Sequence, residues 1–391
     1  MHYTMRRGGA YDRFQMMLEA FLERGSEIHC LSLTPIRVEH PSYHNHMIPL
    51  PFGSGNRFVA RLVTLLLFPL YGLMMAWQEK IDLIVAFGPL YAFLQTLTKC
   101  VLKKPMVTLI RSDLSSGTRA RNRFEGLRVL SKIVDFVGIR SSDRIITNNL
   151  ATQKEIVALV TSCKKEEVKL LLNNIPSIPQ ASEEAAVHVR ARFGIPNGGK
   201  LVVTAGVLNR GKNFEVLIRC LSRVEMKNLF LGIIGDGSTK ADFLYRDYLK
   251  KIVRDLDLSE KVFFTGWVEK EELWKVYRAA DLFILPSLTE GMPNALLEAL
   301  GADLPCIGSD IPGIRDILHF KELMFDPRDE KSLSRIVFQF FSNVEIPTRV
   351  RRLCRERKQV FLFNWKEKVF ETVSGVLFPR EGEGSREGLR S

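Results

Sequence analysis

The sequence predicts an α/β protein made of two doubly wound, Rossmann-like parallel-sheet domains. Short runs of branched aliphatic and aromatic residues alternate with helix-length segments along most of the 391 residues, which is the pattern of βαβ units. This length exceeds one ordinary core and suits two domains of roughly 150 to 200 residues. The six cysteines are scattered, without a CxxC pair and without clustering with the seven histidines. That usage argues against a zinc site and a disulfide framework.

The first half begins with a helical pattern that ends before Gly25, a residue suited to a helix C-cap. A long apolar segment at 62–77 predicts a further helix, and another helix is expected to end near Lys103. Between and after these helices the strand-like runs are 26–33, 81–88, 106–113, 143–149 and 169–176. This alternation predicts the first parallel sheet.

A segment rich in proline, glycine and small residues around a charged helix, 177–200, separates the halves. The alternation of strand and helix then starts again. The strand-like runs of the second half are 201–206, 229–237, 261–267, 281–287 and 305–310. We therefore expect a first domain over 1–178 and a second over 179–358, with a polar tail at 379–391.

The net charge of +12 calls for an acidic partner. The basic stretches of the chain, 119–132 and 349–358, lack interleaved aromatic residues and resemble no nucleic-acid module, so nucleic acid is not the expected partner. The apolar run 62–77 has sixteen residues and contains Pro69, whereas a membrane-spanning helix needs about 20. It reads as a domain helix or as a shallow contact with an anionic membrane.

The N-terminal residues lack the apolar core of a signal peptide, so we expect a cytoplasmic location, including the inner face of the membrane.

Ligands of doubly wound sheets bind beyond the carboxyl ends of the strands, so the residues that follow each strand are candidates. Lys212 precedes a helix expected to begin near Asn213, where free N–H groups and a cation form a phosphate site. A solvated surface lysine is the alternative. Gly235 and Gly237 end another strand and permit close approach of a ligand, although the spacing of a dinucleotide or P-loop motif is absent.

Two glutamates, Glu290 and Glu298, lie on either side of the seven-residue stretch "GMPNALL". The first falls in the turn after a strand, Pro293 suits the first helical position, and the second lies in the following helix. An exposed helix residue and a carboxylate favoured by the helix dipole are the alternatives.

Lys212, the glycine loop at 235–237, "FTGWV" at 264–268 and the stretch 286–313 occur in an order that resembles the family 4 retaining glycosyltransferases of the GT-B fold. The resemblance implies two domains facing across a cleft, with a helix at 359–378 that crosses back to complete the first. Trp365, on that helix, is expected in the core.

The resemblance also implies roles for the residues of the second domain. Glu298 would hold the ribose hydroxyls of a nucleotide, Glu290 would lie near the donor sugar, and Lys212 with Arg210 would balance the diphosphate charge. The loop that approaches the sugar and diphosphate would comprise Gly291, Met292, Pro293 and Asn294, and the glycine turns would add Gly235, Gly237 and Gly266.

The implied reaction is transfer of a hexosyl group from a nucleotide-diphosphate sugar to a glycan or lipid-linked acceptor with retention of configuration. No cofactor and no metal ion are expected.

In the first domain, Gly8 and Gly9 match a glycine pair that approaches the donor, or else form a tight turn. Family members often carry a histidine after the middle strands, where this chain offers Arg111 and Asp113, which form an acceptor-side pair or a plain salt bridge. Val207 stands in place of a common arginine. Because few residues precede Gly8, we predict a short or missing first strand.

Three other functions remain open at this stage. A nucleotide-sugar epimerase or a phosphorylase shares the fold, but the context of the two glutamates disfavours both. A non-catalytic glycan-binding or assembly subunit is consistent with Val207 and with the missing histidine. Turnover of a nucleotide sugar distinguishes this last function from an enzyme.

Overall fold

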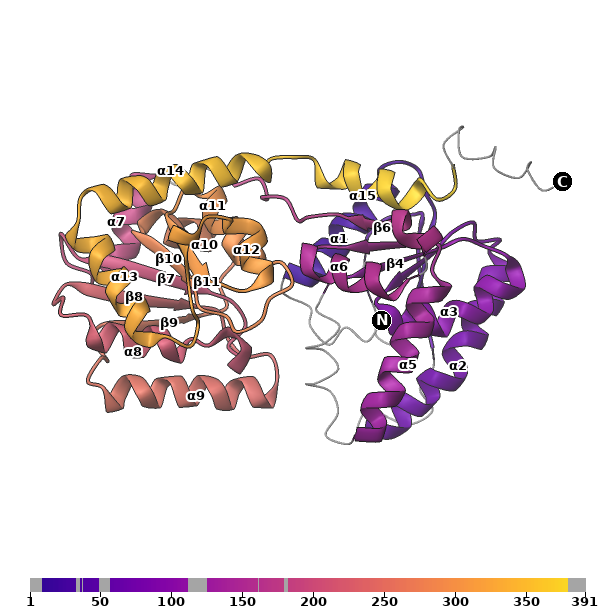
Figure 1. The fold of residues 1–391 in the computed structure, drawn as a ribbon, viewed down its shortest axis with the longest axis horizontal. Helices are drawn as coiled ribbons and strands as arrows, with labels where there is room; N and C mark the ends of the chain where they lie inside the picture. The colour runs from indigo at the N-terminus through magenta and orange to yellow at the C-terminus, as the bar shows by residue number, and fades with distance from the viewer. Residues whose placement is uncertain are drawn as a thin grey trace. The chain divides into compact units, whose positions relative to one another are not determined.

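The computed structural model describes residues 9–32, 36, 38–48, 57–111, 125–160, 162–178 and 182–378 (Figure 1). The chain divides into two compact units, one formed by residues 1–172 and 364–391 and the other by 173–363. The boundaries expected from the sequence were 178/179 and 358/359. None of the described helices combines the length and apolar character needed to cross a membrane.

The first unit contains strands that all pair in parallel, β1 with β2 and β3 through β6 in sequence order. Its strands are β1 (Ile28–Ser32), β2 (Tyr43–Met47), β3 (Ile84–Phe87), β4 (Met106–Ile110), β5 (Arg144–Thr147) and β6 (Val168–Leu170). The five strands expected in this half are confirmed, whereas β2 was not predicted.

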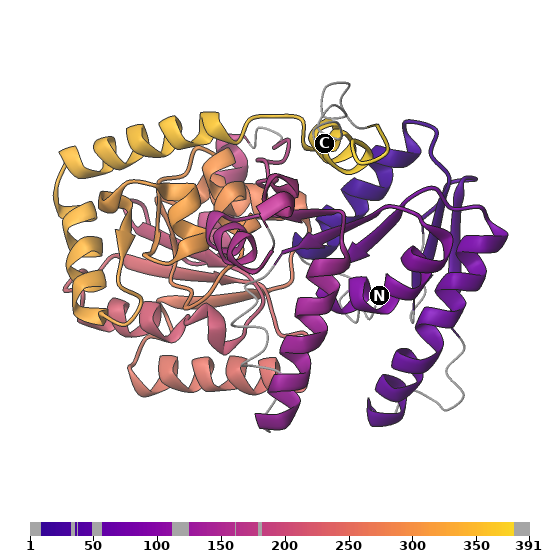
Figure 2. The same ribbon diagram turned by 45° about the vertical axis from the view of Figure 1, so that its right-hand side comes forward.

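The helices of the first unit surround these strands (Figures 1 and 2). They are α1 (Gly9–Leu22), α2 (Arg57–Gln78), α3 (Pro89–Leu102), α5 (Glu125–Ser141), α6 (Leu150–Leu159), the 3-10 helix η1 (Ser162–Glu167) and α15 (Trp365–Ser374). Trp365 is buried, as expected for a core residue. Its ring lies 5.3 Å from the Arg13 guanidinium, so α15 packs on α1.

A cavity of about 540 Å³ lies in the first unit, lined by β1, by β3 and by faces of α1 and α2. The described strands on its two sides belong to separate sheets. Residues 1–8, on which the prediction of a short first strand rests, lie outside the described residues.

The second unit is built on a six-stranded parallel sheet with the order β12-β11-β10-β7-β8-β9. The strands are β7 (Lys200–Ala205), β8 (Leu229–Ile234), β9 (Val262–Gly266), β10 (Leu282–Leu285), β11 (Cys306–Ser309) and β12 (Met324–Phe325). Every residue of β8 and β10 is buried, because helices cover both faces of a doubly wound parallel sheet. All five strands expected in this half are confirmed.

The helices of the second unit follow its strands in turn. They are α7 (Glu183–Arg192), η2 (Arg210–Lys212), α8 (Glu215–Arg223), α9 (Lys240–Asp255), α10 (Lys270–Ala279), α11 (Asn294–Gly301), α12 (Pro312–Leu318), η3 (Lys321–Leu323), α13 (Glu330–Ser342) and α14 (Glu345–Val360).

The strand order of this sheet reverses between β7 and β10. From β7 the chain moves outward through β8 and β9, then returns to the other side of β7 as β10. The loops after β7 and β10 therefore diverge at the carboxyl edge of the sheet. Such a switch point is where doubly wound sheets bind ligands.

Candidate functional site

An ion pair between Lys212 and Glu290 occupies the switch point of the second unit. Lys212 ends η2, which follows β7, and Glu290 follows β10. The Lys212 Nζ lies 2.5 Å from the Glu290 Oε1, and their side chains are 20% and 11% exposed. The Ser287 hydroxyl donates to the same oxygen at 2.7 Å. Topology thus joins two residues that are 78 positions apart.

Hydrogen bonds of the Asn213 side chain fix the turn that carries Lys212. This residue has a left-handed backbone (φ 54°), and its side-chain amide donates to the carbonyls of Pro286 (3.2 Å) and Pro327 (2.9 Å). Helix α8 begins at Glu215, two residues later than expected. Lys212 therefore belongs to a pinned 3-10 turn rather than to the helix end.

Three glycines bring the ends of β7, β8 and β9 into backbone contact. Gly206 donates its N–H to Ile234, and Gly235 donates to Gly266, at 2.9 Å and 3.0 Å. A Cβ atom added to Gly235 would lie 2.1 Å from the Gly206 oxygen. Gly237 follows in the same loop, where its N–H bonds the Asp236 carboxylate at 2.7 Å. A side chain at Gly235 would therefore separate the loops after β7 and β8.

Asn173 holds the loop before α11. Its backbone N–H donates to the Met292 Sδ at 3.0 Å, and its side-chain amide donates to the Asn294 Oδ1 at 2.8 Å. Pro293 is the N-cap residue, and the helix begins at Asn294, so the expected helical start was early by one residue. The loop is therefore anchored at Met292 and at Asn294.

Gly313, on α12, packs closely against the backbone of the same loop. A Cβ atom there would lie 2.2 Å from the Gly291 oxygen and 2.5 Å from the Glu290 oxygen. Sequence reasoning missed Gly313, Ser287 and Asn173 as parts of the site. The proline-glycine pair 312–313 after a strand was the one available signal for such a close contact.

Glu298 lies half-buried on α11, in the turn after the loop. Burial raises the pKa of the Tyr277 hydroxyl well above its ordinary value, and the nearby charge of Glu298 raises it further. The acid therefore stands beside a buried tyrosine of α10.

Arg210, at the start of η2, is directed toward α9. Its guanidinium carbon lies 5.8 Å and 5.5 Å from the ring centres of Tyr245 and Tyr248. The Tyr245 hydroxyl accepts from the Phe214 N–H at 2.9 Å. These contacts hold Arg210 as a cation over two aromatic faces.

The remaining candidates belong to the first unit. Gly9 is the first residue of α1, and Arg111 directly follows β4. Gly8 and Asp113 lie outside the described residues.

Residues 187–357 match the family model described as glycosyl transferases group 1. Among curated proteins, the chain is 31% identical to the mannosylfructose-phosphate synthase of Agrobacterium fabrum over 190 residues, or 47% of this chain and 41% of that protein. The matched segments span 47% and 41% of the first two curated relatives, about half of their length or less.

Two solved structures show the same fold at low sequence identity. Sucrose-phosphate synthase from Thermosynechococcus elongatus superposes with a TM-score of 0.73 at 19% identity, covering 95% of this chain and 93% of that one. Anabaena HepE in complex with UDP-glucose gives 0.70 at 17% identity, covering 85% and 86%. Residues 187–357 are therefore similar to the glycosyl transferases group 1 family, and the chain has the GT-B fold.

Proposed function

We propose that this protein is a retaining glycosyltransferase that moves a hexosyl group from a nucleotide-diphosphate sugar to a glycan or lipid-linked acceptor. The observation that carries the proposal is the ion pair of Lys212 and Glu290 at the switch point of the second sheet. The family match and the HepE complex with UDP-glucose support a nucleotide-sugar donor.

Lys212 is the group best suited to the diphosphate. Its side chain is one-fifth exposed and lies on a pinned turn, so it meets an anion without reorganising the backbone. The N–H groups of the loop 291–294 add donors at the start of α11. Charge that develops on the leaving diphosphate is then balanced by fixed partners, and no metal ion is required for this balance.

The two acids accept hydrogen bonds from hydroxyl groups. Glu298 would accept from the ribose and Glu290 from the donor sugar, because a carboxylate pairs well with neighbouring hydroxyls. During transfer the bond from the anomeric carbon to the diphosphate oxygen breaks. The acceptor oxygen then bonds to the same face, and its proton passes to the diphosphate.

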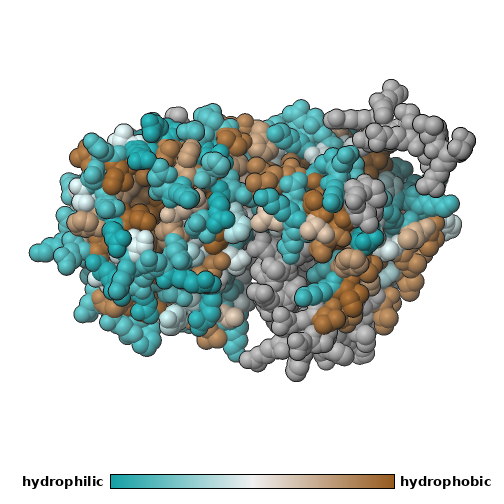
Figure 3. All heavy atoms as spheres, in the orientation of Figure 1, coloured by the Kyte–Doolittle hydropathy of each residue, from teal (hydrophilic) through white to brown (hydrophobic). Residues whose placement is uncertain are grey.

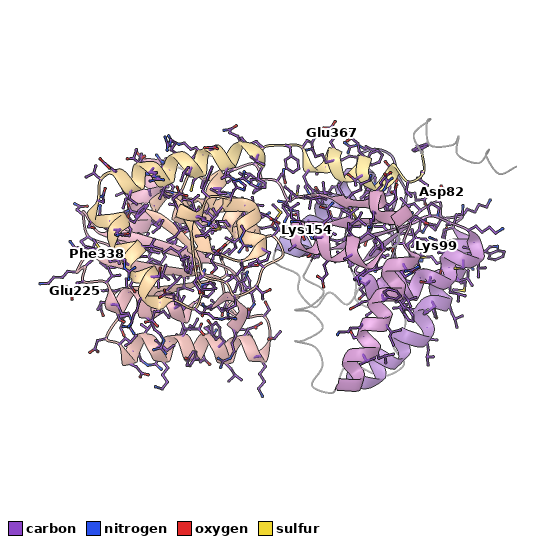
Figure 4. All side chains as sticks on the ribbon, viewed as in Figure 1. Asp82, Lys99, Lys154, Glu225, Phe338 and Glu367 are labelled. Atoms are coloured by element: carbon purple, nitrogen blue, oxygen red, sulfur yellow. The ribbon has the colours of Figure 1, made fainter. Side chains whose placement is uncertain are left out.

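Nucleotide binding tests the donor site first. UDP, GDP, ADP and CMP are titrated calorimetrically against the wild-type protein, Glu298→Ala and Glu225→Ala. Glu225 is an exposed glutamate of the same unit and serves as the matched control (Figure 4). We expect one diphosphate to bind best, and only Glu298→Ala to weaken it. Equal affinity of the wild-type protein and Glu298→Ala, or no nucleotide binding at all, would refute the assignment of Glu298 to the ribose.

Turnover separates an enzyme from a non-catalytic subunit with this fold. Incubation of the preferred nucleotide sugar with candidate acceptors should release the diphosphate, and NMR of the product should show the anomeric configuration of the donor. An inverted product would contradict the retaining mechanism. Nucleotide binding without turnover of any sugar would favour the glycan-binding or assembly function.

We also propose that the first unit contacts an anionic membrane from the cytoplasmic side. Helices α2, α3 and α5 pack in a row and expose apolar side chains, and Figure 3 shows hydrophobic residues gathered over this region. We call this set the apolar patch: Leu66, Leu70, Met74, Trp77, Leu97, Val101, Val129, Leu130, Ile133 and Phe136. Trp77 is 70% exposed, and the exposed Lys132 and Arg140 supply positive charge.

Vesicle flotation tests the membrane contact. The wild-type protein should float with anionic vesicles at physiological salt, and Trp77→Ala with Leu70→Ser should float less. Phe338→Ala removes an exposed aromatic side chain of the second unit and is the matched control (Figure 4). Absence of binding by the wild-type protein, or equal binding by all three proteins, would reject the contact.

A further inference from the structure

Three histidines of the first unit stack on one face of the β1–β2 sheet. The register places His29 opposite His44, and His46 follows two residues later on the same face. The His29 ring centre lies 4.8 Å from that of His44 and 5.2 Å from that of His46, at interplanar angles of 26° and 25°. His29 is the middle ring, and its side chain is only 6% exposed.

Two carboxylates border this stack. Glu79 directly follows α2, and the ligand atoms of His29, His46 and Glu79 all lie within 4.8 Å of one another. On the other side, the Glu27 Oε1 lies 3.5 Å from the His29 Nε2 and 3.0 Å from the His44 Nε2. Imidazole and carboxylate are ligand types that zinc and related ions prefer.

The distances favour one ligand group over the other. The His29 Nδ1 and the His46 Nε2 are 3.0 Å apart, while two nitrogens on a tetrahedral zinc ion stand roughly 3.3 Å apart because each Zn–N bond is about 2.0–2.1 Å. Glu27 meets the opposite ring nitrogen of His29. A carboxylate at that position orients a metal-bound imidazole and leaves the Nδ1 free to bind.

We propose that His29, His46 and Glu79 bind a divalent transition-metal ion of the zinc class, with Glu27 positioning His29. Both His29 and Glu79 line the cavity of the first unit, through which an ion can reach them. The ion would fasten the end of α2 to the β1–β2 sheet. This site differs from the expectation of no metal, and it lies outside the nucleotide-binding residues of the second unit.

Zinc titration of the full chain tests the proposal. The protein is freed of metal, then titrated with Zn²⁺ calorimetrically and with Co²⁺ by visible absorption, which reports tetrahedral coordination. We expect one ion per chain. His29→Gln, His46→Gln and Glu79→Gln should each lower the affinity by about 10-fold or more. Zinc should raise the melting temperature of the wild-type protein by more than that of His46→Gln at the same zinc concentration.

His44→Gln is the matched control, because His44 stacks on His29 but lies outside the proposed ligand set. It should bind zinc within about twofold of the wild-type affinity. Loss of affinity in His44→Gln but not in His46→Gln would assign the ion to Glu27, His29 and His44 instead and overturn the proposal. No zinc binding by the wild-type protein would identify His29 and His46 as a simple hydrogen-bonded pair and overturn it as well.

Discussion

Replacing Gly235 with alanine tests whether the glycine contacts position Lys212. The added Cβ would lie 2.1 Å from the Gly206 oxygen, whereas carbon–oxygen contacts of about 3.3 Å or more are normal. The two loops must therefore separate by roughly 1 Å. Gly206 lies under the aliphatic part of Lys212, since a Cβ there would be 3.3 Å from the Lys212 Cε. The displacement consequently reaches the phosphate-binding turn.

Two costs follow from this substitution. Overpacking a tight contact costs about 1–3 kcal/mol, and alanine at the φ of 118° adds about 1 kcal/mol. Together they should lower the melting temperature by about 5–15 °C for a unit of this size. If the whole free-energy cost of overpacking is lost from nucleotide binding at the turn that carries Lys212, the Kd of the preferred nucleotide diphosphate rises about 5- to 150-fold.

Gly198→Ala supplies the control for backbone strain. Its φ is 81°, and a Cβ atom there has no neighbour within 4 Å. This variant should lose about 1 kcal/mol of stability and keep the wild-type nucleotide affinity. Both variants are melted by circular dichroism and titrated calorimetrically at a temperature where each is folded. If Gly235→Ala binds nucleotide as tightly as Gly198→Ala, the glycine contacts do not position Lys212.

Three further outcomes are expected. Lys212→Met should weaken nucleotide-diphosphate binding by about 10- to 100-fold in calorimetry. Adding Glu290→Gln to this variant should restore its stability without restoring its affinity, because the half-buried carboxylate that lost its partner is then removed. Recovery of affinity in the double variant would contradict the phosphate-binding role of Lys212. Asn173→Ala should loosen the anchored loop and cost about 1–2 kcal/mol in chemical denaturation, and an unchanged midpoint would show that the contact is dispensable. EDTA should leave the affinity for the nucleotide unchanged in the same titration, and a loss of affinity that His46→Gln does not reproduce would indicate a metal in the donor site.

The second sheet could be predicted from the sequence because its strands are continuous apolar runs. Strands β8 and β10 are buried on both faces, and this environment leaves a plain hydrophobic signature. The same reasoning located Lys212 and Glu290 just after their strands. It did not locate the start of α8, because the left-handed Asn213 and the 3-10 turn before it leave no periodic pattern.

Strand β2 escaped prediction because its sequence, "YHNHM", lacks branched aliphatic residues. Its two histidines alternate with polar and aromatic neighbours, so the periodicity of a strand was present without the usual composition. Pairing with β1 supplies the missing information, because it brings His29 between them. A histidine cluster made of two strands is visible only after the register is known.

The acidic pair shows most directly what sequence spacing leaves out. Seven residues between Glu290 and Glu298 predicted a turn residue and a helix residue, and both lie where expected. That spacing does not predict the partner of Glu290. Lys212 lies beside Glu290 because the strand order places β10 next to β7. In the nucleotide-free protein the lysine charge is balanced by this acid. A diphosphate must therefore compete with Glu290 for Lys212, so Glu290→Gln should tighten the binding of a free nucleotide diphosphate while slowing sugar transfer. Weaker binding of the free diphosphate to Glu290→Gln would mean that the ion pair positions the lysine rather than competing for it.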